Sequence, residues 1–560
     1  MKKLIYNIII LSSILFSACD IERNPYNQID TDELFNDPGA VEAAAIGNYA
    51  LLKGDLGYDG WIDQLHRATE YAGDNVSLSG TTVDPLFFLY NYQAIKDNGR
   101  LNSFWRDSFK ITVGTNVIIE KVQEGVSVEI DQILGENYYL RALVYFQMGN
   151  LFGRPYNQGE SNLSAPLKLS SNINDRPKRN TVQEVYNQVI NDLLKAESLM
   201  NIDKGSSFAS KEAAQALLSR VYLYKEDNEK AEEYADKLIN SGKYNLLTRS
   251  EFSMMNTLKP TDNKEVIFAV TLNSDSDLLG QFDNWFTIGS LYAHIDGIGW
   301  GEMYASSSYL DLLNQNPNDA RKSFIAPQYS KDENENKIPS VYWVKEVENE
   351  NGNINYVYQF VKTKNNSGIT TFEYEENEYT LESEEQNGNT VYFFNSPDGR
   401  QNVNFDFDLE KRNGHPKFYI LKASLQENNV HMWSPIVSRL AEMYLNKAES
   451  LAKRGMEQEA LNNINIIRKR AGIPEYTSAN LPAGKTVLEL VLEERRLELA
   501  FEGHRRFDVY RNGNTMNRRY PGTHLNNSNP FFEIPSSHVR VVEFIPERQI
   551  ILQPSLVQNP

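Results

Sequence analysis

The sequence predicts a mainly α-helical protein, built from helical hairpins with long loops and a small β-containing insertion. Apolar residues recur at three- and four-residue spacing over much of the chain, which is the period of an amphipathic helix. A strand-like alternation is concentrated in one stretch between the helical regions. With 560 residues, of which 41% are hydrophobic, the chain can bury a large core.

The first 250 residues carry much of the helical pattern. A polar segment from Asn24 to about Asp37 precedes Pro38, a residue that suits the first turn of a helix. Apolar periodicity predicts helices over residues 40–52, 102–123, 132–150 and 181–200. The last of these opens with Thr181-Val-Gln-Glu184, which is the pattern of a capping box.

Two pairs of segments have the layout of a helical hairpin. Residues 211–224 and 228–241 form one pair, with Ala214, Ala231 and Ala235 at the close-packing positions. Residues 437–454 and 458–471 repeat this layout, with Gly455 in the turn. These units resemble tetratricopeptide repeats at irregular spacing, so we expect a solenoid-like helical scaffold that mainly packs other protein.

The pattern changes between these two regions. Residues 265–272 form a predicted strand, because the apolar run is bounded by polar turns. Residues 275–309 are rich in Gly, Asp and aromatic residues without a period, which predicts a loop. Residues 329–422 are acidic and Asn-rich but contain alternating aromatic and β-branched pieces, which predict a small β-containing insertion rather than disorder.

The N-terminal residues have the pattern of a secretory signal. Lys2 and Lys3 precede an apolar run over residues 4–16, which is too short to span a membrane. Phe16-Ser-Ala-Cys19 then resembles a lipobox, with Phe where Leu is usual, and Cys19 is the only cysteine. We predict that residues 1–18 are removed and that Cys19 is lipidated. Several acyl chains would anchor the protein stably, since each buried methylene contributes about 0.8 kcal/mol.

The densest pattern of charge lies in residues 491–511. Apolar residues alternate there with acids and arginines at helical spacing up to Gly503, which would end the helix. Glu494, Glu498 and Glu502 suggest a hydrolase at first, but each has an arginine within three or four residues, which is ion-pair spacing on a helix. The arginines are Arg495, Arg496, Arg505 and Arg506.

Such pairing opposes catalysis by these acids. Arginine neighbours hold a carboxylate ionised, whereas the acid of a glycosidase needs a raised pKa. We therefore predict a structural charge cluster in this block. Its members are Glu494, Arg495, Glu498, Glu502, Arg505, Asp508 and Arg511.

Several blocks of the chain resemble one known family. Residues 491–511 are similar to its ERRxELxFEGxRxxDxxR block, and residues 138–153 to its early helix with a terminal aromatic-glycine pair. Residues 213–246 and 438–472 resemble its central and C-terminal helical pairs, and residues 556–560 its tail. The chain thus resembles the SusD/RagB family, surface lipoproteins that capture nutrients for TonB-dependent transporters. We expect a signal peptide at 1–18, an N-terminal helical region at 19–250, and a C-terminal region at 251–560 that includes the insertion at about 329–422.

No motif for catalysis or for a cofactor is recognisable. The patterns G-x-S-x-G, HExxH, P-loop and GxGxxG are absent, and the seven histidines have no metal-ligand spacing. We therefore expect a non-enzymatic protein without cofactor or metal. The net charge of −19 argues against nucleic acid as a partner, because nucleic acid binding needs clustered positive charge.

Two aromatic loop regions are the candidates for ligand binding. Sugar rings have apolar C–H faces that lie on aromatic planes, while Asp and Asn side chains bond to their hydroxyl groups. The resembled family builds its ligand site from loops in roughly these two regions. The candidate residues are Trp61, Asp74, Asn75, Phe88, Tyr90, Trp285, Tyr292, Trp300 and Tyr304, the three tryptophans first, and each could instead anchor a packed loop.

The resemblance implies a function. We expect a lipoprotein held in the outer membrane by its lipid anchor, facing the exterior, which binds oligosaccharide and delivers it to a TonB-dependent (SusC-like) transporter. Peptide is the alternative cargo, as the RagB branch implies, because aromatic loops serve either one. A surface glycoside hydrolase is the alternative of another class, and it would need two acids in a pocket free of arginine.

Overall fold

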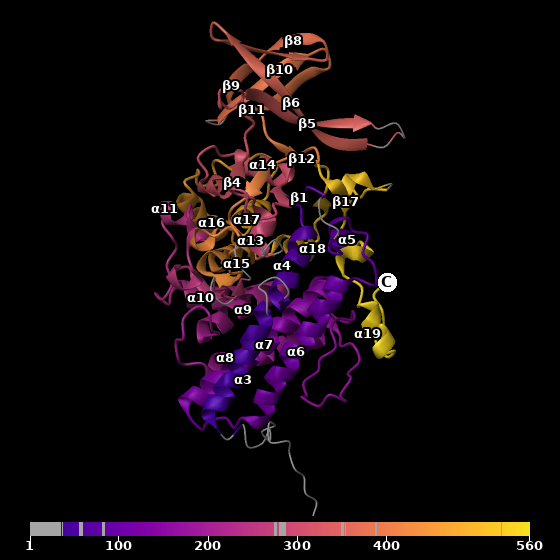
Figure 1. Cartoon of the computed structure of the whole chain (residues 1–560). Helices are drawn as coiled ribbons and strands as arrows, with labels where there is room; N and C mark the ends of the chain where they lie inside the picture. The colour runs from indigo at the N-terminus through magenta and orange to yellow at the C-terminus, as the bar shows by residue number, and fades with distance from the viewer. Residues whose placement is uncertain are drawn as a thin grey trace, which may run out of the picture.

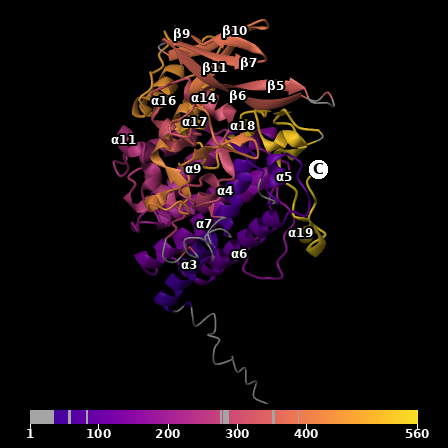
Figure 2. The same ribbon diagram turned by 45° about the horizontal axis from the view of Figure 1, so that its top comes forward.

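The protein consists of a helical body with a β-sheet layer on one end. The computed structural model describes residues 35, 37–54, 60–80, 84–273, 277–278, 287–348, 352, 354–386, 389–527 and 529–560. The helices form the lower part of Figure 1 and the sheet its top, and the sheet remains a distinct layer when that end is turned forward (Figure 2). The predicted fold class, mainly α with a β-containing insertion, is confirmed.

Long helices make up the body, and each packs against neighbours in the sequence. Their bounds are α3 (Pro38–Lys53), α6 (Gly99–Lys121), α7 (Val128–Phe152), α8 (Val182–Leu199), α9 (Lys211–Tyr224), α10 (Asn228–Ile239), α15 (Leu440–Lys453), α16 (Glu457–Ala471) and α17 (Val487–Glu498). α7 lies against both α6 and α8, and α10 lies against both α9 and α15. The last contact joins helices from the two halves of the chain.

Local sequence signals account for several helix ends. The predicted capping box is present: the Glu184 N–H donates to Thr181 Oγ1, and the Thr181 N–H donates to the Glu184 carboxylate at 2.8 Å. Gly455 lies between α15 and α16 with φ of 77°, a left-handed conformation that glycine adopts without a steric cost. Ala231 and Ala235 of α10 are fully buried, so neighbouring helices can approach closely.

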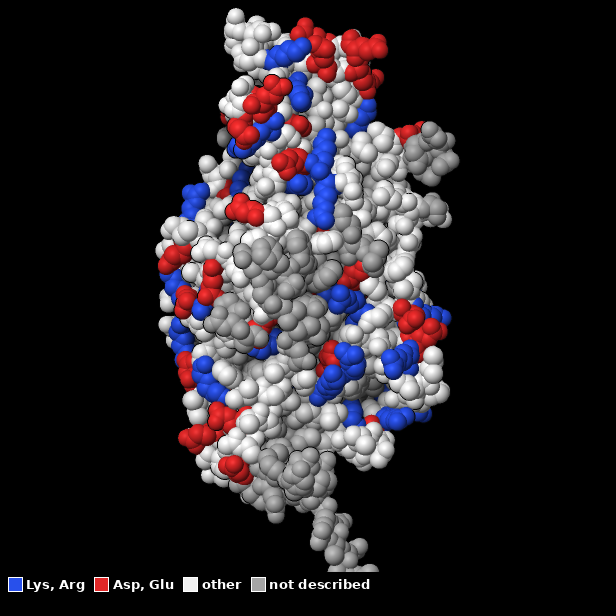
Figure 3. Space-filling model, in the orientation of Figure 1, with Lys and Arg blue, Asp and Glu red and all other residues white. Residues whose placement is uncertain are grey.

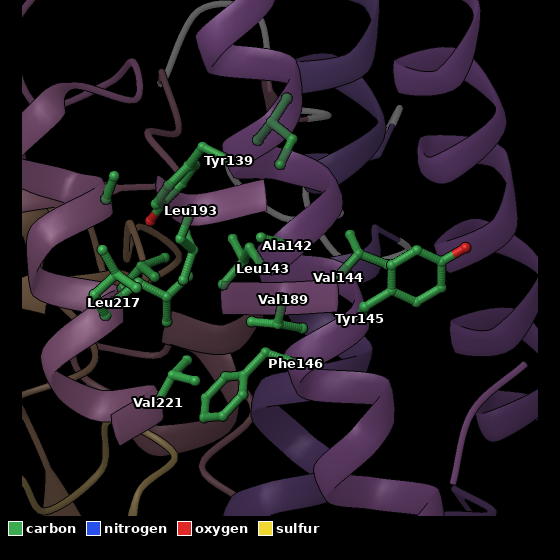
Figure 4. Packing of buried hydrophobic residues seen from close by; sticks show 14 of the residues in the cluster. Tyr139, Ala142, Leu143, Val144, Tyr145, Phe146, Val189, Leu193, Leu217 and Val221 are labelled. Atoms are coloured by element: carbon green, nitrogen blue, oxygen red, sulfur yellow. The ribbon is translucent and has the colours of Figure 1, made fainter. Parts of the chain in front are cut away.

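The largest apolar cluster lies between α7, α8 and α9. Leu143 and Phe146 of α7 meet Leu193 of α8 and Leu217 of α9 (Figure 4). Each of these side chains is at most 2% exposed. Burying such a side chain contributes about 1.5–3 kcal/mol, so this cluster is a main source of stability for the helical body.

Several predictions of local structure were wrong. The segment after residue 60 was expected to be a loop, but it forms α4 (Trp61–Tyr71), in which every residue is buried. Its apolar residues Trp61, Leu65 and Ala68 do recur at helical spacing, and its polar face is buried as well, because polar residues on it are paired, as Arg67 is with Asp63 and Asp84. The second error is the start of α15, because residues before Leu440 form β15 (Ile436–Arg439), paired with the predicted strand β2 (Val266–Ala269).

The C-terminal block also departs from prediction, because α17 ends at Glu498 rather than near Gly503. The chain then turns through Phe501 with φ of 65° and Gly503 with φ of 81° before α18 (Arg505–Arg511). A Cβ at Gly503 would lie 2.9 Å from Thr69 Oγ1. Glycine is therefore needed at 503 both for its conformation and for close packing against α4.

Shorter elements connect the helical body to the sheets. The helices are α5 (Phe87–Tyr90), α11 (Arg249–Phe252), α13 (Ile288–Tyr292), α14 (Ser307–Asn314) and α19 (Glu547–Leu552). The segment 275–309, expected to be a loop, thus contains α13, the start of α14 and the strand β3 (Met303–Ala305) among its described residues. Within the described ranges, no helix has the length and apolar character that a membrane span requires.

The insertion is an antiparallel sheet of seven strands in the order β8-β7-β6-β5-β11-β10-β9. The strands are β5 (Pro339–Glu348), β6 (Ile354–Asn366), β7 (Ile369–Tyr374), β8 (Asn377–Thr380), β9 (Glu382–Gln386), β10 (Asn389–Ser396) and β11 (Gly399–Phe407). Trp343, Phe372 and Phe394 pack into its own apolar cluster. This cluster explains why an acidic, Asn-rich segment folds, as the alternating aromatic residues predicted.

A second sheet lies where the insertion meets the helices. It has the order β1-β3-β14-β4, with β1 (Val76–Leu78), β4 (Ile325–Pro327) and β14 (Phe418–Ile420) joining β3. Small two-stranded sheets are formed by β12 (Lys411–Arg412) with β13 (His415–Pro416), and by β16 (Met516–Asn517) with β17 (Glu533–Ile534). The four-stranded sheet brings segments from both halves of the chain onto one platform.

A buried network of arginines and carboxylates holds the C-terminal block in place. The Glu498 carboxylate accepts from Arg439 Nη1 at 2.7 Å and from Arg470 Nη2 at 2.5 Å. Glu494 accepts from Arg321 at 2.7 Å and from Arg468 at 2.9 Å. These groups are nearly or fully inaccessible to water, so each charge depends on its partner.

The remaining charged residues of the block are paired too, mostly with residues outside it. Glu502 pairs with Arg439 and Lys422 at 2.8 and 2.6 Å, and Arg495 with Glu449 and Asp508 at 3.2 and 3.3 Å. Arg505 pairs with Asp74 at 2.6 Å, Arg506 with Glu543 at 2.5 Å, and Arg511 with Glu449 at 2.5 Å and Asp508 at 2.6 Å. The expectation that the three glutamates pair with arginines of the same block, within three or four residues, was therefore wrong. Their partners come from other elements of the fold.

This pairing changes the acidity of the carboxylates. Burial by itself raises the pKa of Glu498, but Arg470 and Arg439 outweigh it and lower the pKa to about 2. The pKa of Glu502 is likewise lowered, because Arg439 and Lys422 outweigh its burial. These carboxylates stay ionised at neutral pH and cannot serve as general acids.

We expect Glu498→Ala to lower the free energy of unfolding by about 3–5 kcal/mol, because the change leaves buried arginine charges without their partner. The matched control is Glu493→Ala on the same helix, where a partly exposed carboxylate pairs with Lys485. The control should cost under about 1 kcal/mol. Urea unfolding followed by circular dichroism measures both, and equal losses would contradict a network that depends on burial.

Acid should weaken the same network. A carboxyl whose pKa is lower in the folded state contributes its full stabilisation above its ordinary pKa and loses it as the pH falls. For Glu498 this window extends from 4.5 down to about 2. The free energy of unfolding should therefore fall steadily across it, with a shallower slope in Glu498→Ala. An unchanged slope in the variant would show that Glu498 is not part of the acid response.

Candidate functional site

The structure buries most of the aromatic candidates. Trp61, at the start of α4, is 0% exposed, stacks on Phe104 at 5.6 Å between ring centroids, and donates from Nε1 to Ser108 Oγ at 2.8 Å. The cavity beside it has a volume of only 50 Å³. Tyr292 and Tyr304 are 0% and 1% exposed. In this conformation none of these rings offers a face to a ligand.

The polar candidates near α4 form hydrogen bonds and ion pairs with other residues of the protein. Burial raises the pKa of Asp74, but Arg496 and Arg505 outweigh it and lower the pKa to about 2. Asn75 is buried and accepts from Arg496 Nε at 2.9 Å. Tyr90 is fully buried, with its hydroxyl 3.0 Å from His524 Nδ1. Asp74 and Asn75 thus join the C-terminal block to the segment before β1, and Tyr90 joins α5 to the segment around His524.

Two of the candidates keep some exposed surface. Phe88 of α5 is 37% exposed. Trp300 is partly buried and lies in the segment between α13 and β3. Trp285 lies outside the described residues.

The backbone around Trp300 is held in a compact turn. The N–H groups of Trp300 and Gly301 both donate to the carbonyl oxygen of Ser290 at 2.8 Å. Gly299 has φ of 92°, and a Cβ there would lie 2.3 Å from the carbonyl oxygen of Ala293. A Cβ at Gly301 would lie 2.8 Å from the Tyr419 ring. The glycines on both sides of Trp300 therefore allow the turn to close against β14 and fix the position of the indole.

A hairpin from the C-terminal side of the insertion covers the same indole. β12 and β13 are joined by Asn413 and Gly414, with φ of 50° and 81°, as a type I′ turn requires. Arg412 donates to the carbonyl oxygens of Trp300 and Gly301, the latter at 3.3 Å. Its guanidinium carbon lies 5.2 Å from the centroid of the Trp300 ring. This is a cation–π geometry, which holds hairpin and turn together.

These elements enclose a surface cavity, named here the Trp300 pocket. Its volume is 330 Å³. It is lined by His294, Trp300, Lys411, Arg412, Lys417 and Tyr419. Of these, Trp300 was among the predicted ligand-binding residues. Lys411, Arg412, Lys417 and Tyr419 were missed, and the Asn413-Gly414 pair was the sequence signal that could have indicated a hairpin there.

A second groove lies between α14 and the seven-stranded sheet. It has a volume of 300 Å³ and is lined chiefly by amides and aromatic rings, with Asp311 as its carboxylate. Burial raises the pKa of Asp311 to about 6. A glycosidase uses two carboxyl groups, and the described lining of this groove supplies one.

Neither site has the residues of a metal centre. No group of three or more His, Cys, Asp or Glu side chains suited to a metal ion occurs in the described part of the chain. The Trp300 pocket offers an aromatic face, cationic groups and a tyrosine, set on a rigid platform. Such a site can bind a ligand with an apolar face and hydrogen-bonding edges.

Comparison with known proteins gives a consistent result across the chain. The model of the SusD family matches residues 264–560, and a family model described as starch-binding associating with outer membrane matches residues 58–223. SusD-like protein P2 of Formosa agariphila is 24% identical over 527 residues, which cover 91% of this chain and 91% of the relative.

Solved structures agree in fold. A SusD superfamily protein from Bacteroides thetaiotaomicron VPI-5482 aligns with a TM-score of 0.71 at 24% identity, over 93% of this chain and 99% of that one. A putative sugar binding protein from Bacteroides vulgatus ATCC 8482 aligns with a TM-score of 0.69 at 23% identity, over 93% and 98%. Because the SusD family model covers more than half of this chain, and the fold agrees, the chain belongs to the SusD family.

Proposed function

We propose that this protein binds oligosaccharide reversibly in the Trp300 pocket, without cleaving it, and delivers it to a TonB-dependent outer-membrane transporter. The observation that carries the proposal is the pocket itself, where a fixed indole faces a 330 Å³ cavity with donors around it. A sugar ring lies with its C–H face on such an indole while its hydroxyl groups bond to the surrounding side chains.

The family supports a glycan as cargo. One matching family model is described as starch-binding, and one structure of similar fold is described as a putative sugar binding protein. Peptide is the alternative cargo, and no feature of the described pocket favours it over sugar.

The charges around the pocket support binding without cleavage. No Asp or Glu is among the described residues that line the Trp300 pocket. The prominent glutamates of the C-terminal block are buried and paired with arginine, and the pKa of Glu498 is lowered to about 2. A hydrolase needs one carboxyl with a raised pKa beside a second carboxylate at the bound sugar. We therefore propose a binding protein rather than a glycosidase.

Location at the outer membrane accords with the family model described as starch-binding associating with outer membrane. We propose that a lipid on Cys19 supplies the attachment and that the protein faces the exterior. Cys19 lies outside the described residues, so this proposal rests on the signal-like N-terminal sequence. A surface position would place the pocket where extracellular glycans can reach it.

Trp300→Ala should weaken glycan binding by about 1–1.5 kcal/mol, roughly tenfold, because the stacking face is lost. Trp300→Phe should lose less, since part of the aromatic face remains. Trp300→Ala should also lower the melting temperature somewhat, because the indole packs against Arg412 and donates to Glu302, so binding is measured where both variants are folded. The matched control is Phe405→Ala, which removes a 37% exposed ring on β11 outside the pocket.

Calorimetry against a panel of glycans and a panel of peptides measures this prediction. Binding to peptides alone would show that the cargo is peptide rather than oligosaccharide. A cleavage product that accumulates with time would show that the protein is a hydrolase. Full affinity in Trp300→Ala would exclude the Trp300 pocket as the glycan site.

Cys19→Ser should release the protein from the outer membrane, because the lipid would have no attachment site. Fractionation of cells that lack the transporter is the measurement, since the transporter could retain the unlipidated protein. Ser17→Thr, which keeps the cysteine, is the control and should remain in the membrane fraction. If Cys19→Ser protein stayed with the membranes of such cells, lipidation at Cys19 would not be its anchor.

A further inference from the structure

The Trp300 pocket is basic in a protein whose net charge is −19. Lys411, Arg412 and Lys417 contribute three cationic side chains to its lining. On the face shown in Figure 3, Lys and Arg side chains lie in a column at the level where β12 appears in Figure 1. Clustered positive charge in an acidic protein marks a local preference for anions.

Two of these cations have no carboxylate partner within the described ranges. Lys411 is exposed, with its Nζ 4.7 Å from the centroid of the Phe360 ring, and Arg412 lies over Trp300 at 5.2 Å. Lys417 does form an ion pair, with Glu410 at 2.9 Å. In the C-terminal block, by contrast, buried arginines face carboxylates at 2.5–3.3 Å. Arginines of the C-terminal block are therefore neutralised by carboxylates, whereas Lys411 and Arg412 of the pocket have no such partner among the described residues.

The carboxylate that bonds to the indole, that of Glu302, does not line the cavity and therefore does not neutralise the positive charge there. Glu302 is 0% exposed and is not among the residues that line the pocket, and Ser79 Oγ and the Gly80 N–H donate to it at 2.9 Å each. Trp300 Nε1 also donates to it at 3.3 Å. Glu302 thus helps to orient the indole from outside the pocket lining, whereas Lys411, Arg412 and Lys417 belong to that lining.

The Arg412 guanidinium has N–H groups that can donate to a ligand. Its Nη1 donates to the carbonyl oxygens of Trp300 and Gly301, and its Nε and Nη2 form no hydrogen bond within the part of the chain that the structure describes. A guanidinium binds a carboxylate or sulfate through two parallel N–H groups. Lys411, on the same strand, adds a flexible ammonium group.

We propose that the pocket selects anionic glycans, in which a carboxylate or sulfate group is bound by Arg412 and Lys411 while the sugar ring lies on Trp300. This inference rests on the proposed function, because it names the class of glycan that the same site takes. Lys417, held by Glu410, sets part of the positive potential at the opening. Binding should therefore depend on the charge of the sugar and on ionic strength.

Pairs of oligosaccharides that differ only in charge test the proposal. One pair is an oligogalacturonate and its full methyl ester, which separates a carboxylate from a neutral group of similar shape. The other is a sulfated carrageenan oligosaccharide and its desulfated form. The charged member of at least one pair should bind about tenfold more tightly at about 0.02 M salt, and this advantage should shrink at about 0.5 M salt. The preferred pair identifies the anionic group.

Variants that change the charge of the pocket give a second test, in which one substitution should weaken binding of the charged sugar and another should strengthen it. Lys411→Met should weaken binding of the charged sugar about two- to fivefold, the range for an exposed charge, and leave the neutral sugar unaffected. Glu410→Gln should tighten binding of the charged sugar, because it removes the negative charge beside Lys417. The control is Lys364→Met on β6, an exposed lysine that pairs with Glu373 of β7 and is not among the residues that line the pocket.

The results separate this inference from the proposed function. Equal binding of charged and neutral sugars, without an effect of salt, would overturn the anionic preference and leave glycan binding intact. Tighter binding of the neutral members would overturn it as well. Failure of every sugar in both pairs and in the neutral glycan panel would instead overturn the proposed function, and this inference with it.

Discussion

The buried arginine–carboxylate network is the constraint on which the rest of the structure depends. Transfer of a charge out of water costs several kcal/mol, and only close, correctly oriented partners offset it. Glu498, Arg439 and Arg470 satisfy one another from α17, β15 and α16. Since no member of this set is tolerable alone, the C-terminal block is ordered only when these elements are in place together.

The same network reaches the platform of the candidate site. Arg496 and Arg505 bind Asp74, and the Ser306 hydroxyl donates to the Asp74 carbonyl oxygen at 2.6 Å. Asp74 precedes β1, and β1 pairs with β3, which follows Trp300. The charges that stabilise the helical body thus also hold the sheet edge from which the Trp300 turn extends. A pocket on so rigid a support needs little reorganisation when a flexible sugar binds.

Charge is used in two ways in this protein. In the core, the glutamates of the C-terminal block pair with arginines, and Glu498 and Glu502 stay ionised at neutral pH. In the Trp300 pocket, Lys411 and Arg412 face solvent without an opposing carboxylate in the described structure. The aromatic face supplies contact area for a sugar, and the leftover charge would supply selectivity, because electrostatic complementarity acts mainly on specificity.

The sequence by itself determined the helices with strong periodicity and caps, such as α8 with its Thr181 box, and the β-containing insertion. It also indicated that Glu498 would be paired with arginine, and it included Trp300 among the ligand candidates. Only the tertiary structure decided which arginines are the partners, because Arg439 and Arg470 lie outside the block and leave no local trace. It also decided that Trp61 is buried while Trp300 lines a cavity, and that Lys411, Arg412 and Lys417 lie beside it. Periodicity reports contacts along one element, whereas burial and pocket composition depend on which distant elements pack together.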